Sequence, residues 1–348
     1  MRSFGIGVIG CGYWGPNLVR NFARHPQCRV VAVCDTRRER LERVAREYGI
    51  PTATQRPEQL FAMPEIDLVV VATPSFTHFG LARAALEAGK HVLVMKPLTT
   101  SSAHAQELVA LAQAKGLLLA VDHTFVFTGA VRRMRELIER GEIGELYYFD
   151  SVRINLGLIQ TDVNVVWDLA PHDVSIMDYV LGAEATSVAA QAASHGASPT
   201  ENIAYLTVRF PGALMGHVHV NWLAPAKVRR TIVGGSKRMM IYDDMEPSEK
   251  LKIYDKGVSI SGDMNSDNEY QYMISYRSGD MHAPNLETRE ALAVEVENIV
   301  AALEGREALV ADGQAGERVV RILEAAQRSI HEGGAVVALE TGTVSGAA

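Results

Sequence analysis

The sequence contains little cysteine and no long apolar run. Three of its 348 residues are cysteines, Cys11, Cys28 and Cys34, and their spacing matches no pattern of metal ligands. No apolar run approaches the roughly 20 residues that a membrane-spanning helix needs, and the N-terminus lacks the basic and apolar segments of a targeting peptide. These absences predict a cytoplasmic protein of a reducing compartment that has no membrane partner.

The sequence also lacks clusters of like charge. Charged residues make up 22% of the chain and the formal net charge is −7, without a lysine- or arginine-rich tail. A nucleic-acid-binding protein needs concentrated cations to neutralise phosphates, so nucleic acid is not expected as a partner. With 47% hydrophobic residues, the composition is that of a globular protein long enough for two domains.

A glycine-rich turn lies between a predicted strand and a predicted helix at the N-terminus. Three glycines follow the apolar run Phe4–Ile9, namely Gly10, Gly12 and Gly15. Pro16 then suits the first turn of a helix. Glycines in this pattern permit a sharp turn, close approach of the backbone to a pyrophosphate, and close packing of helix on strand. The pattern predicts a βαβ unit that binds a dinucleotide.

An acidic residue at the end of the next apolar run indicates which dinucleotide is bound. Asp35 follows the run Arg29–Cys34, twenty residues after Gly15. From that place a carboxylate accepts hydrogen bonds from the adenosine ribose and repels a 2′-phosphate, which favours NAD over NADP. Arg37 and Arg38 leave NADP open, because they could reach a 2′-phosphate or simply begin a solvated helix.

The remaining apolar runs predict two domains. Up to Asp122, runs typical of buried strands alternate with helical segments, as around Asp67–Ala72 and His91–Met95. Beyond it, runs of β-branched and aromatic residues alternate with polar ones. The sequence therefore predicts an α/β protein, with a doubly wound parallel Rossmann sheet in residues 1–122 and an α+β domain with a large, mostly antiparallel open sheet in residues 123–348. The last two helices could pack back on the first domain.

One face of the second sheet needs a cover. With helices on one side only, the other face is either half-polar and solvated or packed against a second subunit. The alternation of Val218, Val220 and Trp222 with polar residues fits both arrangements. We expect a homodimer or homotetramer that forms through this open face.

Two groups of residues could carry chemistry. Lys96 comes directly after the strand His91–Met95, at the edge where ligands of open α/β sheets bind. It could polarise a substrate hydroxyl there, or be an ordinary surface lysine. Asp168 and His172 are four residues apart and share one face if their segment is helical. A histidine beside a carboxylate is a tunable general base, although a helix cap and a structural histidine would give the same spacing.

Other chemistries find less support. Four histidines are scattered along the sequence and do not have the spacing of a zinc site: His123, His172, His217 and His219. No serine or cysteine lies in the motif of a nucleophile elbow. The basic segment Lys227–Arg230 follows a predicted strand. It either protects a sheet edge by its charge or captures a phosphate or carboxylate, which suits the planar fork of arginine.

Several separated motifs together resemble one enzyme family. They are the glycine-rich start, Thr73-Pro74 with His78, Ala88-Gly89-Lys90-His91-Val92 leading to Lys96-Pro97-Leu98, and the spacing of Asp168 and His172. In this order they resemble the Gfo/Idh/MocA family of sugar and cyclitol oxidoreductases, over essentially the whole chain. The resemblance implies that Lys96, Asp168 and His172 form the catalytic group. Met95 departs from the family, which usually has glutamate before the lysine.

The resemblance extends to the branch of the family that acts on nucleotide sugars. The segments that carry it are Gly12–Asn17, Asp162–Asn164 ahead of Trp167–Asp173, and Asn221–Leu223 with Pro225, Lys227 and Arg229. Relatives in that branch oxidise the 3-hydroxyl of UDP-N-acetylglucosamine or of its uronic acid. The implied function is NAD-dependent oxidation of a secondary hydroxyl of a sugar to a ketone. The basic segment would then suit a diphosphate or a uronate.

The motifs and the resemblance together name the residues expected at the site. Those expected at the cofactor are Gly10, Gly12, Tyr13, Trp14, Gly15, Asp35, Thr73, Pro74, His78, Lys96 and Pro97. Those expected at a small-molecule substrate are Lys96, His123, Arg153, Asn155, Asn164, Trp167, Asp168, His172, Lys227 and Arg229. No metal ion is expected.

Three alternatives stay open. The same fold could work in reverse as an NADPH-dependent ketosugar reductase, or it could oxidise an inositol or a free sugar. A non-catalytic regulator that senses dinucleotides would use the same glycine turn. Under that hypothesis, the presence of Lys96, Asp168 and His172 in the expected pattern would be a coincidence.

Overall fold

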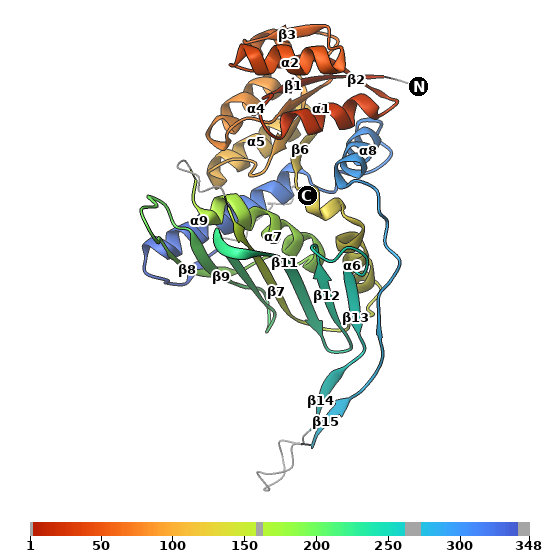
Figure 1. Ribbon diagram of the computed structural model, residues 1–348, viewed down its shortest axis with the longest axis vertical. Coiled ribbons are helices and arrows are strands. Elements are labelled where there is room, and N and C mark those ends of the chain that lie inside the picture. The colour runs from red at the N-terminus through yellow and green to blue at the C-terminus, as the bar shows by residue number, and fades with distance from the viewer. Residues whose placement is uncertain (1–2, 158–162, 262–272, 340–348) are drawn as a thin grey trace, which may run out of the picture. The chain divides into compact units, whose positions relative to one another are not determined.

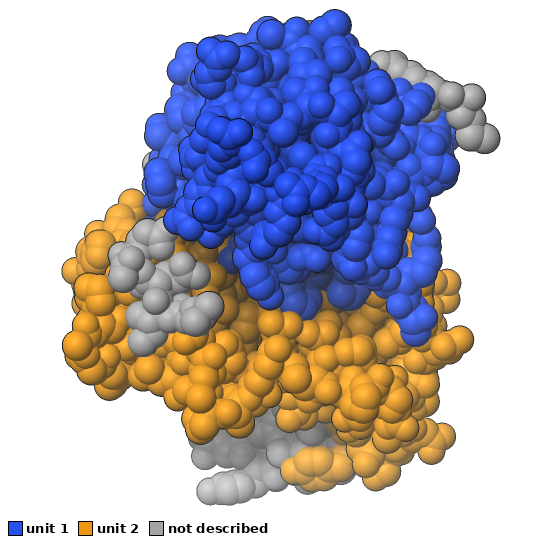
Figure 2. Space-filling model, turned by 45° about the horizontal axis from the view of Figure 1, so that its top comes forward, with its two compact units in different colours: residues 1–128, 288–324 blue, residues 129–287, 325–348 orange. Residues whose placement is uncertain are grey.

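The chain forms two compact units. The computed structural model describes residues 3–157, 163–261 and 273–339. Contacts between Cα atoms assign residues 1–128 and 288–324 to one unit and residues 129–287 and 325–348 to the other (Figure 2). The first unit therefore includes a segment from near the C-terminus in addition to the N-terminal part. No helix in the described ranges is long and apolar enough to cross a membrane.

Six parallel strands make up the sheet of the first unit (Figure 1). They are β1 (Phe4–Ile9), β2 (Cys28–Cys34), β3 (Thr52–Thr54), β4 (Leu68–Val71), β5 (His91–Met95) and β6 (Leu119–Asp122). Their order is β3-β2-β1-β4-β5-β6, and every neighbouring pair is parallel. The order reverses between β1 and β4, which is where a doubly wound sheet binds its ligand. The predicted Rossmann sheet is confirmed.

Helices follow most strands of this sheet. They are α1 (Gly15–Arg24), α2 (Arg38–Tyr48), α3 (Pro57–Phe61), α4 (His78–Glu87) and α5 (Ser102–Lys115), with short 3₁₀ turns η1 (Ser75–Thr77) and η2 (Thr124–Phe127). Both α2 and α5 end at a glycine in the left-handed region, Gly49 and Gly116, each with φ of 63°. Glycine adopts this conformation without strain, so it defines where each helix ends.

The returning C-terminal segment helps to close the core of the first unit. It carries α8 (Ala291–Leu303) and the beginning of α9 (Gly313–His331). On α8, Val296 and Ile299 are buried in one apolar cluster with Phe22 of α1 and Val70 of β4. Burying such side chains stabilises a fold by about 1.5–3 kcal/mol each, which explains why this helix belongs to the first unit.

The second unit contains a nine-stranded sheet. Its strands are β7 (Leu146–Leu156), β8 (Ser187–Ala193), β9 (Ile203–Arg209), β10 (Met215–Asn221), β11 (Leu223–Gly235), β12 (Met239–Asp243), β13 (Leu251–Tyr254), β16 (Met281–His282) and β17 (Val337–Ala338). The order is β16-β13-β12-β11-β7-β10-β9-β8-β17, and β7 with β10 is the parallel pair. A separate hairpin joins β14 (Gly257–Ser261) to β15 (Met273–Arg277). The predicted mostly antiparallel sheet is confirmed.

The two faces of the nine-stranded sheet differ in burial. Helix α7 (Val165–Leu181) packs on β10, β7 and β9, and α6 (Gly129–Glu139) packs against α7. Toward α7, Val218 and Val220 of β10 are fully buried. On the opposite face, the ring of Tyr205, which is 45% exposed, stacks on His219 with centroids 4.3 Å apart. The alternation seen in the sequence thus separates a helix-covered face from an exposed one.

The glycine turn provides a test of how tightly β1, α1 and β4 are packed. A Cβ atom on Gly15 would lie 1.9 Å from the carbonyl oxygen of Gly10, a backbone atom. We expect Gly15→Ala to lower the free energy of unfolding in urea by about 1–3 kcal/mol, because the turn must open. Gly80 lies in α4 with nothing within 4 Å of its Cβ position. Gly80→Ala should therefore raise stability by about 0.5–1 kcal/mol, and equal effects of the two substitutions would contradict this packing.

Candidate active site

The glycine turn of the first unit leaves its backbone open to a ligand. Gly10 has a φ of 101°, and a Cβ there would lie 2.2 Å from the carbonyl oxygen of Ala72. Gly12 differs, because its Cβ position meets only a guanidinium nitrogen of Arg40, at 3.6 Å. Gly10 and Gly15 therefore shape the turn, whereas the absence of a side chain at Gly12 leaves space for a pyrophosphate to approach the backbone.

Asp35 lies at the end of β2 and supports this turn. Its Oδ2 accepts a hydrogen bond from the backbone N–H of Cys11 at 2.7 Å, and its Oδ1 accepts one from the N–H of Arg37, also at 2.7 Å. Each carboxylate oxygen can accept a further hydrogen bond, so ribose hydroxyls can still bind there. Arg38 is directed elsewhere, since its Nε donates to Glu42 at 2.6 Å.

Arg40 is a candidate that the sequence motifs did not identify. Its guanidinium lies beside Gly12, where the backbone is open. Arginine binds phosphate oxygens through a planar pair of donors. Nothing in the sequence separates Arg40 from the other arginines of α2, so only its placement marks it as a phosphate-binding candidate.

His78 joins the loops that follow β4 and β5. Its Nδ1 is 2.8 Å from the carbonyl oxygen of Pro97, and its Nε2 is 2.8 Å from that of Thr73. Burial lowers the pKa of His78, although the hydrogen bonds to these two carbonyl groups oppose the change. The ring is therefore neutral at pH 7, and only one of its two nitrogens carries a proton to donate. His78 therefore helps to position Thr73 and Pro97. Pro74 is exposed at the surface of its loop.

Lys96 and His123 lie at the ends of neighbouring strands. Lys96 follows β5, is half-buried and forms a cis peptide bond with Pro97. His123 follows β6 and is buried, and neither of its ring nitrogens makes a hydrogen bond to a described residue. Burial, together with the positive charges of Lys96 and Arg318, lowers the pKa of His123 to about 3. A neutral buried imidazole with no protein partner for either nitrogen is suited to hydrogen-bond a ligand.

The two aromatic residues of the glycine turn are placed very differently. Tyr13 is 91% exposed, whereas Trp14 is half-buried. The indole Nε1 of Trp14 donates to the Oδ2 of Asp122 at 2.9 Å. Trp14 is thus fixed by a side-chain hydrogen bond to the last residue of β6.

The first turns of α7 carry the pair of residues predicted for catalysis. Asn164 caps the helix, because its Oδ1 accepts from the N–H of Trp167 at 3.1 Å. Asp168 and His172 follow within the helix, both half-buried and one turn apart. They therefore share one face of α7, as their spacing predicts. Asp162, which belongs to the same motif, lies outside the described residues.

Asp168 is held by a residue of the neighbouring sheet that the sequence did not single out for this role. The Nε1 of Trp222, which is 2% exposed, donates to the Oδ2 of Asp168 at 3.1 Å. Trp222 follows β10, on the face against which α7 packs. The sequence alone did not show this contact because the residues are 54 positions apart.

Two predicted substrate residues use their polar groups inside the second unit. Arg153 of β7 is 3% exposed, and its Nε donates to the Oδ2 of Asp173 at 2.6 Å. Asn164 donates from its Nδ2 to Glu201 at 2.9 Å and to Gln327 at 2.6 Å, in addition to its capping role. Both residues thus hold α7 in place. Asn155, two residues beyond Arg153 on β7, is half-buried on the same face.

The basic segment on β11 is partly neutralised. Arg229 donates to the Oδ2 of Asp244 at 3.1 Å. Burial raises the pKa of Asp244, but hydrogen bonds from Arg229 and Tyr242 and the charge of Lys250 outweigh it and lower that pKa overall. Lys227 is exposed at the beginning of the same strand. Of the predicted substrate residues in this segment, Lys227 is the one exposed to solvent.

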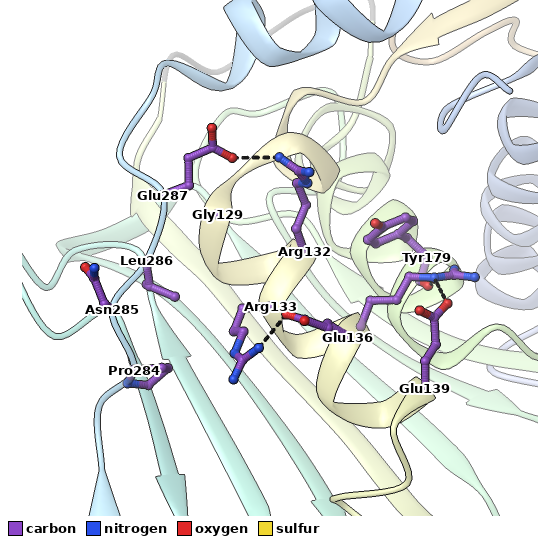
Figure 3. Close-up of a pocket in the computed structure, with 11 residues that line it drawn as sticks. Gly129, Arg132, Arg133, Glu136, Glu139, Tyr179, Pro284, Asn285, Leu286 and Glu287 are labelled. Carbon is purple, nitrogen blue, oxygen red and sulfur yellow. Dashed lines mark hydrogen bonds and ion pairs between the residues drawn. The ribbon is translucent and has the colours of Figure 1, made fainter. Parts of the chain in front are cut away.

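A pocket elsewhere in the second unit contains none of the predicted residues. It has a volume of about 600 Å³ and lies beside α6 (Figure 3). Three arginines line it and each has a carboxylate partner there: Arg132 with Glu287, Arg133 with Glu136, and Arg135 with Glu139. Its charges cancel in pairs, so it offers no unbalanced group for chemistry.

Two family models match the chain. One, described as the oxidoreductase family with an NAD-binding Rossmann fold, matches residues 4–123, and the other, the GFO/IDH/MocA C-terminal domain, matches residues 131–241. The uncharacterized oxidoreductase YdgJ of Escherichia coli (strain K12) is 32% identical over 259 residues, which are 70% of this chain and 72% of that protein. The chain belongs to the Gfo/Idh/MocA family.

Other Gfo/Idh/MocA relatives carry named activities. The scyllo-inositol 2-dehydrogenase (NAD(+)) of Bacillus subtilis (strain 168) is 33% identical over 189 residues, 53% of this chain and 54% of that enzyme. The UDP-N-acetylglucosamine 3-dehydrogenase of Acidithiobacillus ferrooxidans is 27% identical over 316 residues, 90% of this chain and 93% of that enzyme. A solved structure of that organism's UDP-N-acetylglucosamine 3-dehydrogenase GnnA has a TM-score of 0.80 at 24% identity, covering 95% of this chain and 99% of that one.

NAD is the cofactor of this Gfo/Idh/MocA protein, and the residues of the first unit fit it. The open backbone at Gly12 suits the pyrophosphate, and Asp35 at the end of β2 suits the ribose hydroxyls. His123 offers a buried hydrogen-bonding group at the end of β6. The protein is an NAD-binding oxidoreductase of two units.

Asp35 provides a test of cofactor selectivity. Replacing it in Asp35→Ser removes the charge that repels a 2′-phosphate and an acceptor for the ribose. We expect the affinity for NADH to fall and that for NADPH to rise, so that their ratio changes by roughly tenfold or more. Fluorescence titration of both cofactors measures the ratio. Glu39→Gln removes an exposed charge from the first turn of α2 and serves as the control; an unchanged ratio in Asp35→Ser would exclude this role.

Proposed function

We propose that the protein is an NAD-dependent dehydrogenase that oxidises a secondary hydroxyl of a sugar, namely the 3-hydroxyl of a UDP-N-acetylhexosamine or of its uronic acid. The observation that carries the proposal is the pair Asp168 and His172 on the first turns of α7, with Asp168 oriented by Trp222. The relation to UDP-N-acetylglucosamine 3-dehydrogenase, which extends over 90% of this chain, supports the choice of substrate.

Each residue has a distinct role in this reaction. Bound NAD supplies the hydride acceptor. His172 accepts the proton of the substrate hydroxyl as a general base. The ammonium group of Lys96 polarises the hydroxyl oxygen and stabilises the negative charge that develops on it. Asp168 orients His172 or the substrate, since one of its oxygens is already held by Trp222.

The remaining predicted substrate residues would bind the rest of the molecule. His123 is neutral and can both donate and accept a hydrogen bond. In the second unit, Lys227 and Arg229 supply positive charge that suits a diphosphate or a uronate, and Asn155 and Trp167 supply polar and aromatic contacts. Lys227 is the exposed cation of this group, so we assign it the largest share of that charge recognition.

A second candidate function is oxidation of an inositol or a free sugar. The 33% identity with scyllo-inositol 2-dehydrogenase over about half of each chain favours it. A panel of UDP-sugars, inositols and free sugars, assayed by the absorbance of reduced nicotinamide with NAD and with NADP, decides between the two. Turnover of an inositol in preference to every UDP-sugar would overturn the nucleotide-sugar proposal, and reduction of ketosugars only by NADPH would favour the reverse reaction.

The catalytic assignment predicts a separation of turnover from cofactor binding. We expect His172→Ala and Lys96→Ala each to lower kcat by on the order of 10²–10⁴-fold, because a proton acceptor or an electrophile is lost. The affinity for NADH should change far less. Lys256→Ala alters an exposed lysine of the second unit and should leave kcat unchanged. Wild-type turnover in His172→Ala would rule out its role as the base.

We propose in addition that the protein forms a homodimer or homotetramer through the exposed face of the nine-stranded sheet. Tyr148 and Tyr205 lie on this face and are 37% and 45% exposed. Burying such aromatic surface between subunits is favourable. Light scattering should give two or four times the mass of 37.9 kDa, and Tyr205→Glu should lower the mass to that of one chain. A monomeric wild-type protein would exclude this arrangement.

A further inference from the structure

A hydrogen bond joins the glycine turn to β6 of the NAD-binding sheet. Trp14 lies in the turn that follows β1, and its Nε1 donates to the Oδ2 of Asp122 at 2.9 Å. Asp122 is the last residue of β6. In the order β1-β4-β5-β6, the two partners come from segments that are three strands apart. The turn is therefore held by a group outside its own βαβ unit.

Asp122 is itself fixed by the segment that follows β6. It is 1% exposed, and its Oδ1 accepts from the N–H of Thr124 at 3.1 Å and from the Oγ1 of Thr124 at 2.5 Å. Two donors on one oxygen restrict the rotation of the carboxyl group, and its other oxygen faces the indole of Trp14. Asp122 thus offers Trp14 an acceptor whose position is set before any ligand binds.

Apolar packing restricts the indole of Trp14 as well. The half-buried ring packs against the buried cluster that contains Leu18 and Phe22 of α1 and Val296 of α8. A side chain that has both a packing surface and a hydrogen bond of fixed direction keeps little rotational freedom. The side chain of Trp14 is consequently held at two places, the apolar cluster and Asp122.

The backbone of Trp14 begins helix α1. Its carbonyl oxygen accepts from the N–H of Asn17 at 2.9 Å, whereas the N–H groups of a first helical turn have no acceptor within their helix. Indole is a donor only, so the side chain of Trp14 cannot cap these groups. They lie next to the open backbone at Gly12, where a dinucleotide fold receives the pyrophosphate. Fixing Trp14 therefore fixes the donors that the phosphate groups would use.

We propose that Asp122 is a positioning residue for NAD: by accepting the Nε1–H of Trp14, it holds the glycine turn in the conformation that binds the pyrophosphate. A turn that already has its binding conformation loses less entropy when the cofactor binds. Without this acceptor the indole gains rotational freedom. Cofactor affinity then falls although the backbone donors at the pyrophosphate are unchanged. This role concerns cofactor binding and does not depend on which sugar is oxidised.

A double-mutant cycle tests this connection by titration with NADH, in which bound cofactor is followed by its fluorescence. Trp14→Phe keeps an aromatic ring and removes the donor. Asp122→Asn keeps the size of the side chain; its amide oxygen stays with the two donors of Thr124, so its NH₂ group meets Trp14 and cannot accept. We expect each substitution to weaken NADH binding roughly tenfold, the size of one buried hydrogen bond. The double variant should bind within about twofold of either single variant, because both remove the same contact.

Asp67→Asn is the matched control. Asp67 directly precedes β4, at the amino-terminal edge of the same sheet, and its Oδ2 accepts from the N–H of Gly5 at 2.8 Å. The substitution alters a half-buried carboxylate that accepts a hydrogen bond away from the turn, so NADH affinity should stay near that of the wild type. Thermal unfolding of each variant confirms that all are folded during titration. Additive losses in the cycle, or an equal loss in Asp67→Asn, would overturn the proposal.

The indole N–H signals in nuclear magnetic resonance give a readout that general destabilisation would not produce. The chain has three tryptophans, Trp14, Trp167 and Trp222, whose signals in isotopically labelled protein are assigned by substitution. Hydrogen exchange of the Trp14 indole should be roughly tenfold faster in Asp122→Asn than in the wild type, because its acceptor is lost. The indole of Trp222, which donates to Asp168 in the second unit, should keep its exchange rate. Equal acceleration of both signals, or of neither, would contradict the role of Asp122.

Discussion

Close backbone packing at the glycine turn is the constraint on which the NAD-binding half of the protein depends. The Cβ positions of Gly10 and Gly15 are occupied by carbonyl oxygens of Ala72 and Gly10, so β1, α1 and the end of β4 approach one another without side chains between them. This closeness places the N–H of Cys11 within reach of Asp35 and directs Trp14 toward Asp122. The same geometry leaves Gly12 open, so packing and cofactor access have one cause.

Buried charge is handled in three different ways, each with a consequence for function. Asp173 forms a buried ion pair with Arg153, which fixes α7 on its sheet because breaking such a pair leaves an uncompensated buried charge. Burial and the neighbouring carboxyl group of Asp122 raise the pKa of Glu295 well above its usual value. His123 stays neutral because burial and the charge of Lys96 oppose its protonation. The first arrangement stabilises the fold, whereas the other two leave polar groups able to respond to a ligand.

The sequence predicted what depends on local pattern. The apolar run His91–Met95 marked β5 to the residue, and the four-residue spacing of Asp168 and His172 gave their shared helical face. Periodicity does not report which distant polar groups meet, so it missed the contact of Trp222 with Asp168 and that of Trp14 with Asp122, which are 54 and 108 positions apart. For the same reason the sequence did not predict the pairing of Arg153 with Asp173, although Asp173 lies within the motif itself.

The register of the parallel sheet shows what lies beside Met95, the position at which the family usually has glutamate. In parallel strands, paired residues point to the same face, so Asp122 presents its carboxyl group on the side where a glutamate at position 95 would. Met95 packs instead against the apolar cluster that includes Val296 and Ile299 of α8. The same carboxyl group of Asp122 accepts the Nε1–H of Trp14, which connects this edge of the sheet to the glycine turn.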